Sequence, residues 1–374
     1  MKLDLTGLRA APGQVWGGVR LVPLIRDRPI TSLRLHTQIY DGDLGVVKVD
    51  PRSYYLSYIP HGFVATWTDD GSPAAAYGTE IVADQRPPSA SVPVRFHRRM
   101  ARRTDKDRLR FLPMHLAMEG YLALHFGGPS IVWEHWSERA VRRGLSPRVE
   151  QAYVGAEIDG LADALRVFEI HPGQCGVLVY VADALATAFV VPHPDDYRAL
   201  HTTILQDLYG ELIYHYAHYA MPVQRFEARL SDADAHDLRA AVCREQAAWT
   251  EFHDGTMAAG LLDSTYDVRR VYDMRGFTLS RFLPSFQLKR ENHIGELITD
   301  RHGRTAYLKT FRLAENQVRR GYLLTLLAAA DWHLPTAATR LGISQSHLGL
   351  RIEAAGFGDL LREDILAHYR KLRA

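Results

Sequence analysis

The sequence has few cysteines and no long apolar run. Cys175 and Cys243 are its only cysteines in 374 residues, and two cysteines cannot build a disulfide framework or a cysteine-rich zinc site. No apolar run approaches the ~18 residues that a membrane span needs. The N-terminus carries an acid at Asp4 and no apolar block behind a basic start, unlike a secretory signal. We therefore expect a cytoplasmic protein without a membrane partner.

Nucleotide-binding and metal-binding signatures are also missing. The Gly17-Gly18 and Gly127-Gly128 pairs lack the remaining residues that a P-loop or a dinucleotide fingerprint requires. A predicted helix over 203–219 places carboxylates and imidazoles at one-turn spacing, which can ligate a metal. That stripe matches no named motif and borders an apolar face, so we interpret it as a solvated helix edge. Its residues are Asp207, Glu211, His215 and His218. We expect neither a cofactor nor a bound metal.

The composition is that of an ordinary globular protein, with 47% hydrophobic and 24% charged residues. The chain is long enough for two or three domains. Residues 14–82 alternate β-branched and aromatic runs with turn signals such as Asp41-Gly42, which is typical of antiparallel strands. Further strands are predicted at 165–191 and a hairpin at 286–299. Helices are predicted at 116–124, 133–143, 205–219, 231–249 and from about 312 onward. This mixture predicts an α+β fold.

We divide the chain into three parts on this pattern. Residues 1–225 form an antiparallel-sheet-containing α+β domain that binds a ligand or partner. Residues 226–311 form an α+β connecting segment with a β-hairpin. Residues 312–374 form a helical module.

The helical module carries the most specific local pattern. A first helix is predicted over 319–329, a second over 335–341 and a third over 345–355. Pro335 fits a first helical turn, where a missing N–H costs nothing. Gly342 can adopt the positive φ that ends the second helix, and Ser344 can cap the third. The pattern predicts a helix-turn-helix.

The run from Trp332 to Leu348 resembles the Fis-type (factor for inversion stimulation) helix-turn-helix nearly position by position. That family reads DNA as a dimer with its third helix in the major groove, so the resemblance implies DNA as a partner and a homodimer. The base-reading candidates lie at the start of the third helix, and a phosphate contact lies about two turns in. These residues are Gln345, Ser346, His347 and Arg351.

The third helix departs from the family in its charge. Residues 349–355 carry one base and one acid, whereas family members usually place several bases there. Because phosphate contacts supply most affinity for duplex DNA, this helix alone predicts weak binding. A three-helix unit kept for packing or dimerisation remains the alternative.

A basic segment over 95–110 carries eight Lys or Arg against two Asp. It could supply the phosphate contacts that the third helix lacks. It could instead bind a phosphorylated small molecule, because the planar guanidinium group of arginine matches the geometry of a phosphate. A solvated helix face or loop is the alternative. The candidate phosphate-binding residues are Arg98, Arg99, Arg102 and Arg103.

Polar residues also gather among the strand signals of 160–220. A cysteine beside a Gly-containing turn, with His and acids nearby, could be a nucleophile with its base. The alternative for Cys175 is a buried core position, since cysteine is among the most buried residue types. The candidate ligand pocket comprises Glu169, His171, Cys175, Asp183 and Glu211.

Residues 14–220 as a whole resemble the bacterial ADP-ribosylglycohydrolase and rhodanese-phosphatase associated proteins. The resemblance lies in the run from Trp16 to Leu24 and in the block from Phe168 to Glu211. It implies an α+β domain linked to nucleotide or ADP-ribose metabolism, and it transfers no catalytic residue. Two functions stay open. One is a regulatory protein with a sensor or interaction domain and a helix-turn-helix. The other is an enzyme acting on a nucleotide-like or ADP-ribose-like ligand, with a structural helical module.

Overall fold

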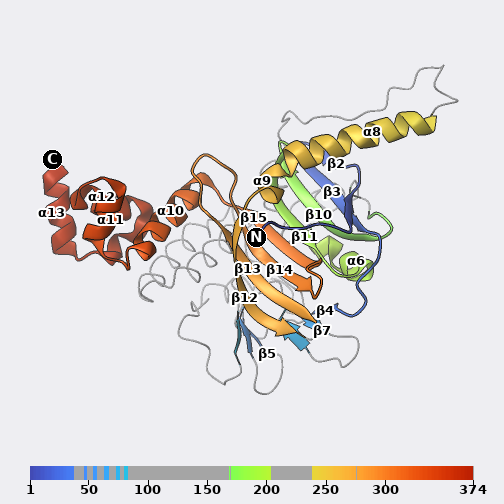
Figure 1. The fold of residues 1–374 in the computed structure, drawn as a ribbon, viewed down its shortest axis with the longest axis horizontal. Helices are drawn as coiled ribbons and strands as arrows, with labels where there is room; N and C mark the ends of the chain where they lie inside the picture. Colours follow the sequence, from blue (N-terminus) through green and yellow to red (C-terminus); the bar gives the residue numbers. More distant parts are fainter. Residues whose placement is uncertain are drawn as a thin grey trace, which may run out of the picture.

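A nine-stranded antiparallel sheet organises the chain in the computed structural model (Figure 1). The structure describes residues 1–37, 46–48, 54–56, 63–66, 73–75, 80–82, 168, 170–203, 238–274 and 276–373. The strand order is β1-β3-β10-β11-β15-β14-β13-β12, and β2 also pairs with β3. Helices accompany this sheet, so the α+β class expected from the sequence is confirmed.

The large sheet draws its strands from two distant parts of the chain. The early strands are β1 (Leu8–Ala10), β2 (Gln14–Trp16), β3 (Val19–Arg26), β10 (Gln174–Val181) and β11 (Ala184–Val190). The late strands are β12 (Tyr266–Met274), β13 (Phe277–Pro284), β14 (His293–Asp300) and β15 (Thr305–Arg312). Consequently the sheet contains strands from both sides of the boundary predicted near residue 225.

Two three-stranded sheets complete the described strands. One consists of β4 (Arg34–Thr37), β7 (Phe63–Thr66) and β8 (Pro73–Ala75), and the other of β5 (Val46–Lys48), β6 (Tyr54–Leu56) and β9 (Glu80–Val82). All of their pairings are antiparallel, as the turn signals over 14–82 predicted.

The central strands are near-continuous apolar runs because both faces of the sheet are covered. Every residue of β3 is buried, and so is all of β10 except its last residue. β3 accommodates Pro23 because its carbonyl points to the gap between β1 and β2, where it accepts the N–H of Ala11 at 2.9 Å. The missing N–H of Pro23 therefore faces no sheet partner.

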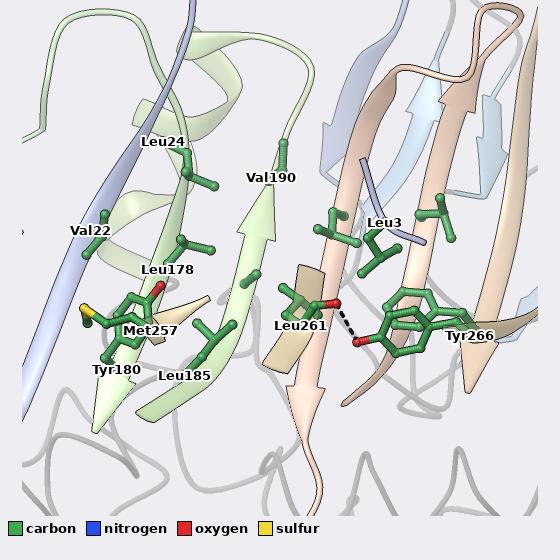
Figure 2. Close-up of a cluster of buried hydrophobic side chains, with 14 of the residues drawn as sticks. Leu3, Val22, Leu24, Leu178, Tyr180, Leu185, Val190, Met257, Leu261 and Tyr266 are labelled. Atoms are coloured by element: carbon green, nitrogen blue, oxygen red, sulfur yellow. Dashed lines mark hydrogen bonds between the residues drawn. The ribbon is translucent and has the colours of Figure 1, made fainter. Parts of the chain in front are cut away.

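One face of the sheet forms the main core, shown in Figure 2. It is covered by the N-terminal segment and by α8 (Leu238–Phe252), the π-helical turn η4 (His253–Met257) and α9 (Ala259–Leu262). Leu3, Met257 and Leu261 pack here against strand residues such as Leu178. The Tyr266 hydroxyl donates to the carbonyl of Leu261 at 2.9 Å, which ties α9 to β12.

The late strands pair differently from the predicted hairpin. The turn at 300–303 is confirmed, since Asp300 Oδ1 accepts the N–H groups of His302 and Arg304 and Gly303 has φ 80. The strand predicted at 286–288 is wrong. Phe286 has φ 50, which ends extended structure, and its ring packs on Gly321, where any side chain would collide with it.

The remaining helices are α6 (Pro194–Thr203) and a C-terminal group. That group comprises α10 (Glu315–Ala329), α11 (Leu334–Leu341), α12 (Gln345–Ile352), the short turns η5 (Glu353–Phe357) and η6 (Gly358–Leu360), and α13 (Glu363–Arg373). It lies to one side of the sheet in Figure 1. Its core contains Leu324, Leu327, Ala337, Ala338, Leu348, Ile352 and Phe357.

The predicted local signals of these helices are confirmed. Pro335 lies in the first turn of α11, Gly342 ends that helix with φ 64, and the Ser344 side chain accepts the N–H of His347 at 3.2 Å. The third helix is shorter than predicted, because α12 ends at Ile352 and continues as the wider turn η5.

We predict that Ala337→Glu or Leu348→Asp unfolds the C-terminal helices while the sheet stays folded. Both side chains are buried, 1% and 0% exposed, and a buried unpaired charge costs several kcal/mol. Hydrogen exchange of the full chain measures this, with faster exchange expected over α10 to α12. Ala354→Glu, at an exposed position, is the matched control. Unchanged protection in the Ala337→Glu and Leu348→Asp variants would refute the core assignment.

Candidate functional site

The structure places two of the predicted pocket residues at the start of β10. Cys175 is fully buried, and its thiol lies 3.9 Å from the carbonyl of Pro192. Burial raises the pKa of the Cys175 thiol to about 11, although Arg26 acts in the opposite direction. The thiol is therefore protonated at neutral pH and a poor nucleophile. His171 is exposed in the turn that precedes the strand.

Asp183 lies at the opposite end of β10, in the tight turn to β11. The length of the strand separates it from Cys175 by roughly 25 Å, at ~3.3 Å per residue. The structure therefore does not bring these two residues together. Glu169 and Glu211 lie outside the described residues, as do Arg98, Arg99, Arg102 and Arg103 of the basic segment.

The end of the sheet that holds Asp183 contains a buried polar cluster, which we call the His253 cluster. β3, β10, the β10–β11 turn, α8 and η4 contribute to it. Its residues are Arg20, Tyr180, Asp183, Trp249, His253 and Asp254. Tyr180 and Arg20 are directly opposite each other in the β3–β10 pairing, and η4 places His253 over them. Single π-helical turns of this kind occur frequently at functional sites.

A hydrogen-bonded chain runs through the cluster from the surface inward. His253 Nδ1 lies 2.7 Å from Asp254 Oδ1, and His253 Nε2 lies 2.8 Å from the Tyr180 hydroxyl. Because a carboxylate only accepts, Nδ1 carries the proton and Nε2 accepts from Tyr180. The Asp254 side chain is exposed, whereas those of His253 and Tyr180 are buried. The chain thus connects solvent to a buried phenol.

Burial sets the protonation states along this chain. It lowers the pKa of His253, although Asp254 favours the charged ring, and it raises the pKa of Tyr180. His253 is consequently a neutral acceptor and Tyr180 a protonated donor at neutral pH. Such a phenol–imidazole–carboxylate chain can move a proton between the buried hydroxyl and the surface.

Aromatic and ionic contacts hold the chain in place. Arg20 lies 5.4 Å from the centre of the Trp249 ring and pairs with Asp183 at 3.0 Å. The Trp249 and His253 rings lie 5.4 Å apart. Sequence reasoning identified only Asp183 of this cluster, because Tyr180 and His253 are 73 residues apart. The adjacent pair His253-Asp254 was the one local signal.

The predicted DNA-reading residues lie on α12. Gln345, His347 and Arg351 are exposed, and Ser346 is half-buried with its hydroxyl 3.0 Å from that of Ser344. The opposite side of α12 is covered, because Gly349 contacts the Tyr369 ring of α13 so closely that any side chain would collide. The structure therefore presents the first turn of α12 and the stripe through His347 and Arg351.

Within the described residues, no helix combines the length and the apolar character that a membrane crossing requires. In the same part of the chain, no group of three or more His, Cys, Asp or Glu side chains is placed to hold a metal ion.

Fold and site together define an α+β protein in which one end of a large antiparallel sheet encloses a polar cluster. The family model ARPP-2 matches residues 3–275, and the chain therefore belongs to the ARPP-2 family. The match confirms the resemblance of the N-terminal part, and the whole His253 cluster lies inside it. No curated protein and no solved structure matches the chain.

We predict that the protein loses stability as the pH falls below about 6.5. His201, His253 and His293 are buried, and burial lowers each pKa below the ordinary value. A lowered folded-state pKa means that the unfolded chain binds more protons. The stabilisation is complete above the unfolded pKa and is lost as the pH drops through it.

Melting temperatures between pH 7.5 and 5.5 measure this loss. His253→Gln should reduce the proton uptake on unfolding by up to about one proton, whereas His368→Gln, at an exposed position, should leave it unchanged. A melting temperature that is flat over this range would contradict the assignment of buried neutral histidines.

Proposed function

We propose that this ARPP-2 protein is a regulatory protein whose sheet domain binds a ligand or partner and whose C-terminal helices bind DNA as a homodimer. The single observation that carries the proposal is the open first turn of α12. It presents Gln345 and His347 to solvent beside the Ser344 cap. Gln can pair with adenine in the major groove, so this turn has base-reading chemistry at the position where such helices read DNA.

Packing around α12 supports this proposal. Small Ala337 and Ala338 are buried between α11 and α12, and Leu348 and Ile352 bury the inner side of α12. The helix is thereby fixed with its first turn outward. The compact unit α10–α12 has the size of a DNA-reading module, and the same surface in a dimer would present two such helices one helical turn of DNA apart.

The charge of the C-terminal helices predicts modest affinity for DNA. Residues 312–374 contain nine Lys or Arg against six Asp or Glu. The acid predicted for the third helix, Glu353, lies in η5 directly after α12, and Arg370 pairs with both Glu353 and Glu363. Arg340 and Arg351 remain on the exposed surface. With so few bases, dimerisation or a second basic segment such as 95–110 must contribute phosphate contacts.

A salt titration of affinity for random-sequence duplex tests the proposal. Wild type should bind at ~50 mM salt and lose affinity steeply as salt rises. Arg351→Ala should lower the salt slope by about one. Gln345→Ala/His347→Ala should leave the slope unchanged and weaken any sequence preference selected from a duplex pool.

Arg269→Ala is the matched control for charge, because it removes an exposed arginine from the sheet edge at β12. It should change neither affinity nor slope. If wild type shows no detectable binding at ~50 mM salt, DNA binding is excluded and the C-terminal helices serve packing or dimerisation.

A second function is favoured by one observation, the Asp254–His253–Tyr180 chain. We propose as the alternative an enzyme that acts on a nucleotide-like or ADP-ribose-like substrate, with the C-terminal helices structural. In that role Tyr180 would take a proton from the attacking water as its own proton passes to His253 Nε2, and Asp254 would stabilise the imidazolium that forms.

The enzymatic alternative is tested by incubating the protein with ADP-ribose or NAD and separating the products by chromatography. If wild type converts either, Tyr180→Phe should reduce the rate by at least ~100-fold, the usual lower range for general acid–base catalysis. Tyr266→Phe is the matched control, since it also removes a buried hydroxyl from the same core. Conversion that is equal in both variants, or absent in wild type, would contradict this alternative.

A further inference from the structure

One side of α13 exposes apolar side chains to solvent. Ile365 is 37% exposed and Leu372 63%, which places both among the exposed large hydrophobic residues of the described surface. Seven residues separate them, and the exposed His368 lies between. The three side chains therefore share one stripe of the helix, at i, i+3 and i+7. We call Ile365, His368 and Leu372 the α13 stripe.

The other side of α13 is bound to the C-terminal helices. Leu366 is 2% exposed, the Tyr369 ring contacts Gly349 of α12, and Arg370 pairs with Glu353 of η5. These contacts fix the rotation of the helix, so the α13 stripe faces outward. In Figure 1, α13 is the element of the C-terminal group that lies farthest from the large sheet. A second copy of the chain can therefore reach the stripe without meeting that sheet.

The charges beside the α13 stripe are divided along the helix. Asp364 lies in the first turn, and Lys371 lies seven residues later on the same flank of the stripe. Both residues are exposed. Two such helices placed parallel would bring acid next to acid and base next to base. Placed antiparallel, they bring each Asp364 next to Lys371 of the other copy.

A twofold axis through the middle of the stripe generates the antiparallel arrangement from one surface. It places Ile365 against Leu372 of the second copy, twice, and His368 beside the axis. Antiparallel helices also align the opposite ends of their dipoles, which favours this arrangement over the parallel one. The stripe is thus self-complementary in its apolar residues and in its charges.

We propose that the α13 stripe is the surface through which two copies of this chain associate, with their α13 helices antiparallel. The inference rests on the homodimer of the proposed function and deepens it by naming the surface that forms the dimer. A helix of 11 residues offers far less than the ~800 Å² per partner of a stable interface. We therefore expect a weak dimer, with a dissociation constant on the order of 10–100 μM.

Sedimentation equilibrium of the full-length protein without DNA measures this association. Ile365→Glu and Leu372→Glu should each weaken it at least ~10-fold, because the twofold axis brings two added carboxylates into the apolar contact. Leu288→Glu is the matched control, since Leu288 is 48% exposed in the loop between β13 and β14. It should leave the dissociation constant unchanged.

Charge reversal tests the pairing of Asp364 with Lys371. Asp364→Lys and Lys371→Glu should each weaken self-association by about 10-fold at low salt, since each reverses two ion pairs. An equimolar mixture of the two variants should regain the wild-type affinity, because the mixed pair again places a base beside an acid at both positions. The mixture controls for folding, since an unfolded α13 could not regain affinity.

Cysteine cross-linking measures the orientation of the two helices. The background is Cys243→Ser, because Cys243 is exposed. His368→Cys should give a disulfide-linked dimer, since both copies lie beside the axis. Ile365→Cys should not, because antiparallel helices separate its two copies by roughly 10 Å at ~1.5 Å per residue, beyond the ~7 Å reach between bridged Cα atoms.

Cross-linking at both positions would show parallel helices and overturn the proposed surface. A dimer that withstands Leu372→Glu and does not cross-link at residue 368 would overturn this inference, while the homodimer of the proposed function would stand. A monomer at every concentration up to ~300 μM, well above the expected dissociation constant, would overturn the inference and the homodimer together. DNA binding is decided separately by the salt titration.

Discussion

The sheet depends on the pairing of β11 with β15, which joins the early strands to the late ones. Four residue pairs make this junction, from Thr187 with Phe311 to Val190 with Leu308. Side chains reinforce it, because the Thr187 hydroxyl donates to the carbonyl of Thr310 and the Thr310 hydroxyl accepts the N–H of Ala188. Without this junction the main core would split into two incomplete halves. The His253 cluster draws its strand residues from the early half.

Much of the local structure could be predicted from the sequence. The apolar runs at 174–190 predicted strands, and Pro335, Gly342 and Ser344 predicted where the C-terminal helices begin and end. These signals are local, since each depends on the conformational preference of one residue or on a short run. The α+β class followed from the mixture of such signals. The contact of Gln345 with DNA bases stays a prediction.

Strand order and site could not be predicted, because they depend on contacts between distant residues. Nothing near Thr187 indicates that its partner lies at Phe311, and nothing near Tyr180 indicates His253. Cys175 was grouped with Asp183 by closeness in sequence, but an extended strand holds its two ends apart. The wrong strand at 286–288 has a similar origin, since the left-handed backbone there accompanies packing on Gly321, a contact from another element.

The junction between β11 and β15 also governs how the protein must be made. The ARPP-2 match ends at residue 275, yet among the described strands β12 reaches the rest of the sheet through β13, β14 and β15. During synthesis the edge of β11 therefore stays open until more than a hundred further residues have left the ribosome. An open apolar edge is a template for intermolecular pairing, and such long-range closure is slow. The nascent chain needs protection over this interval, by a chaperone or by its own intervening segments.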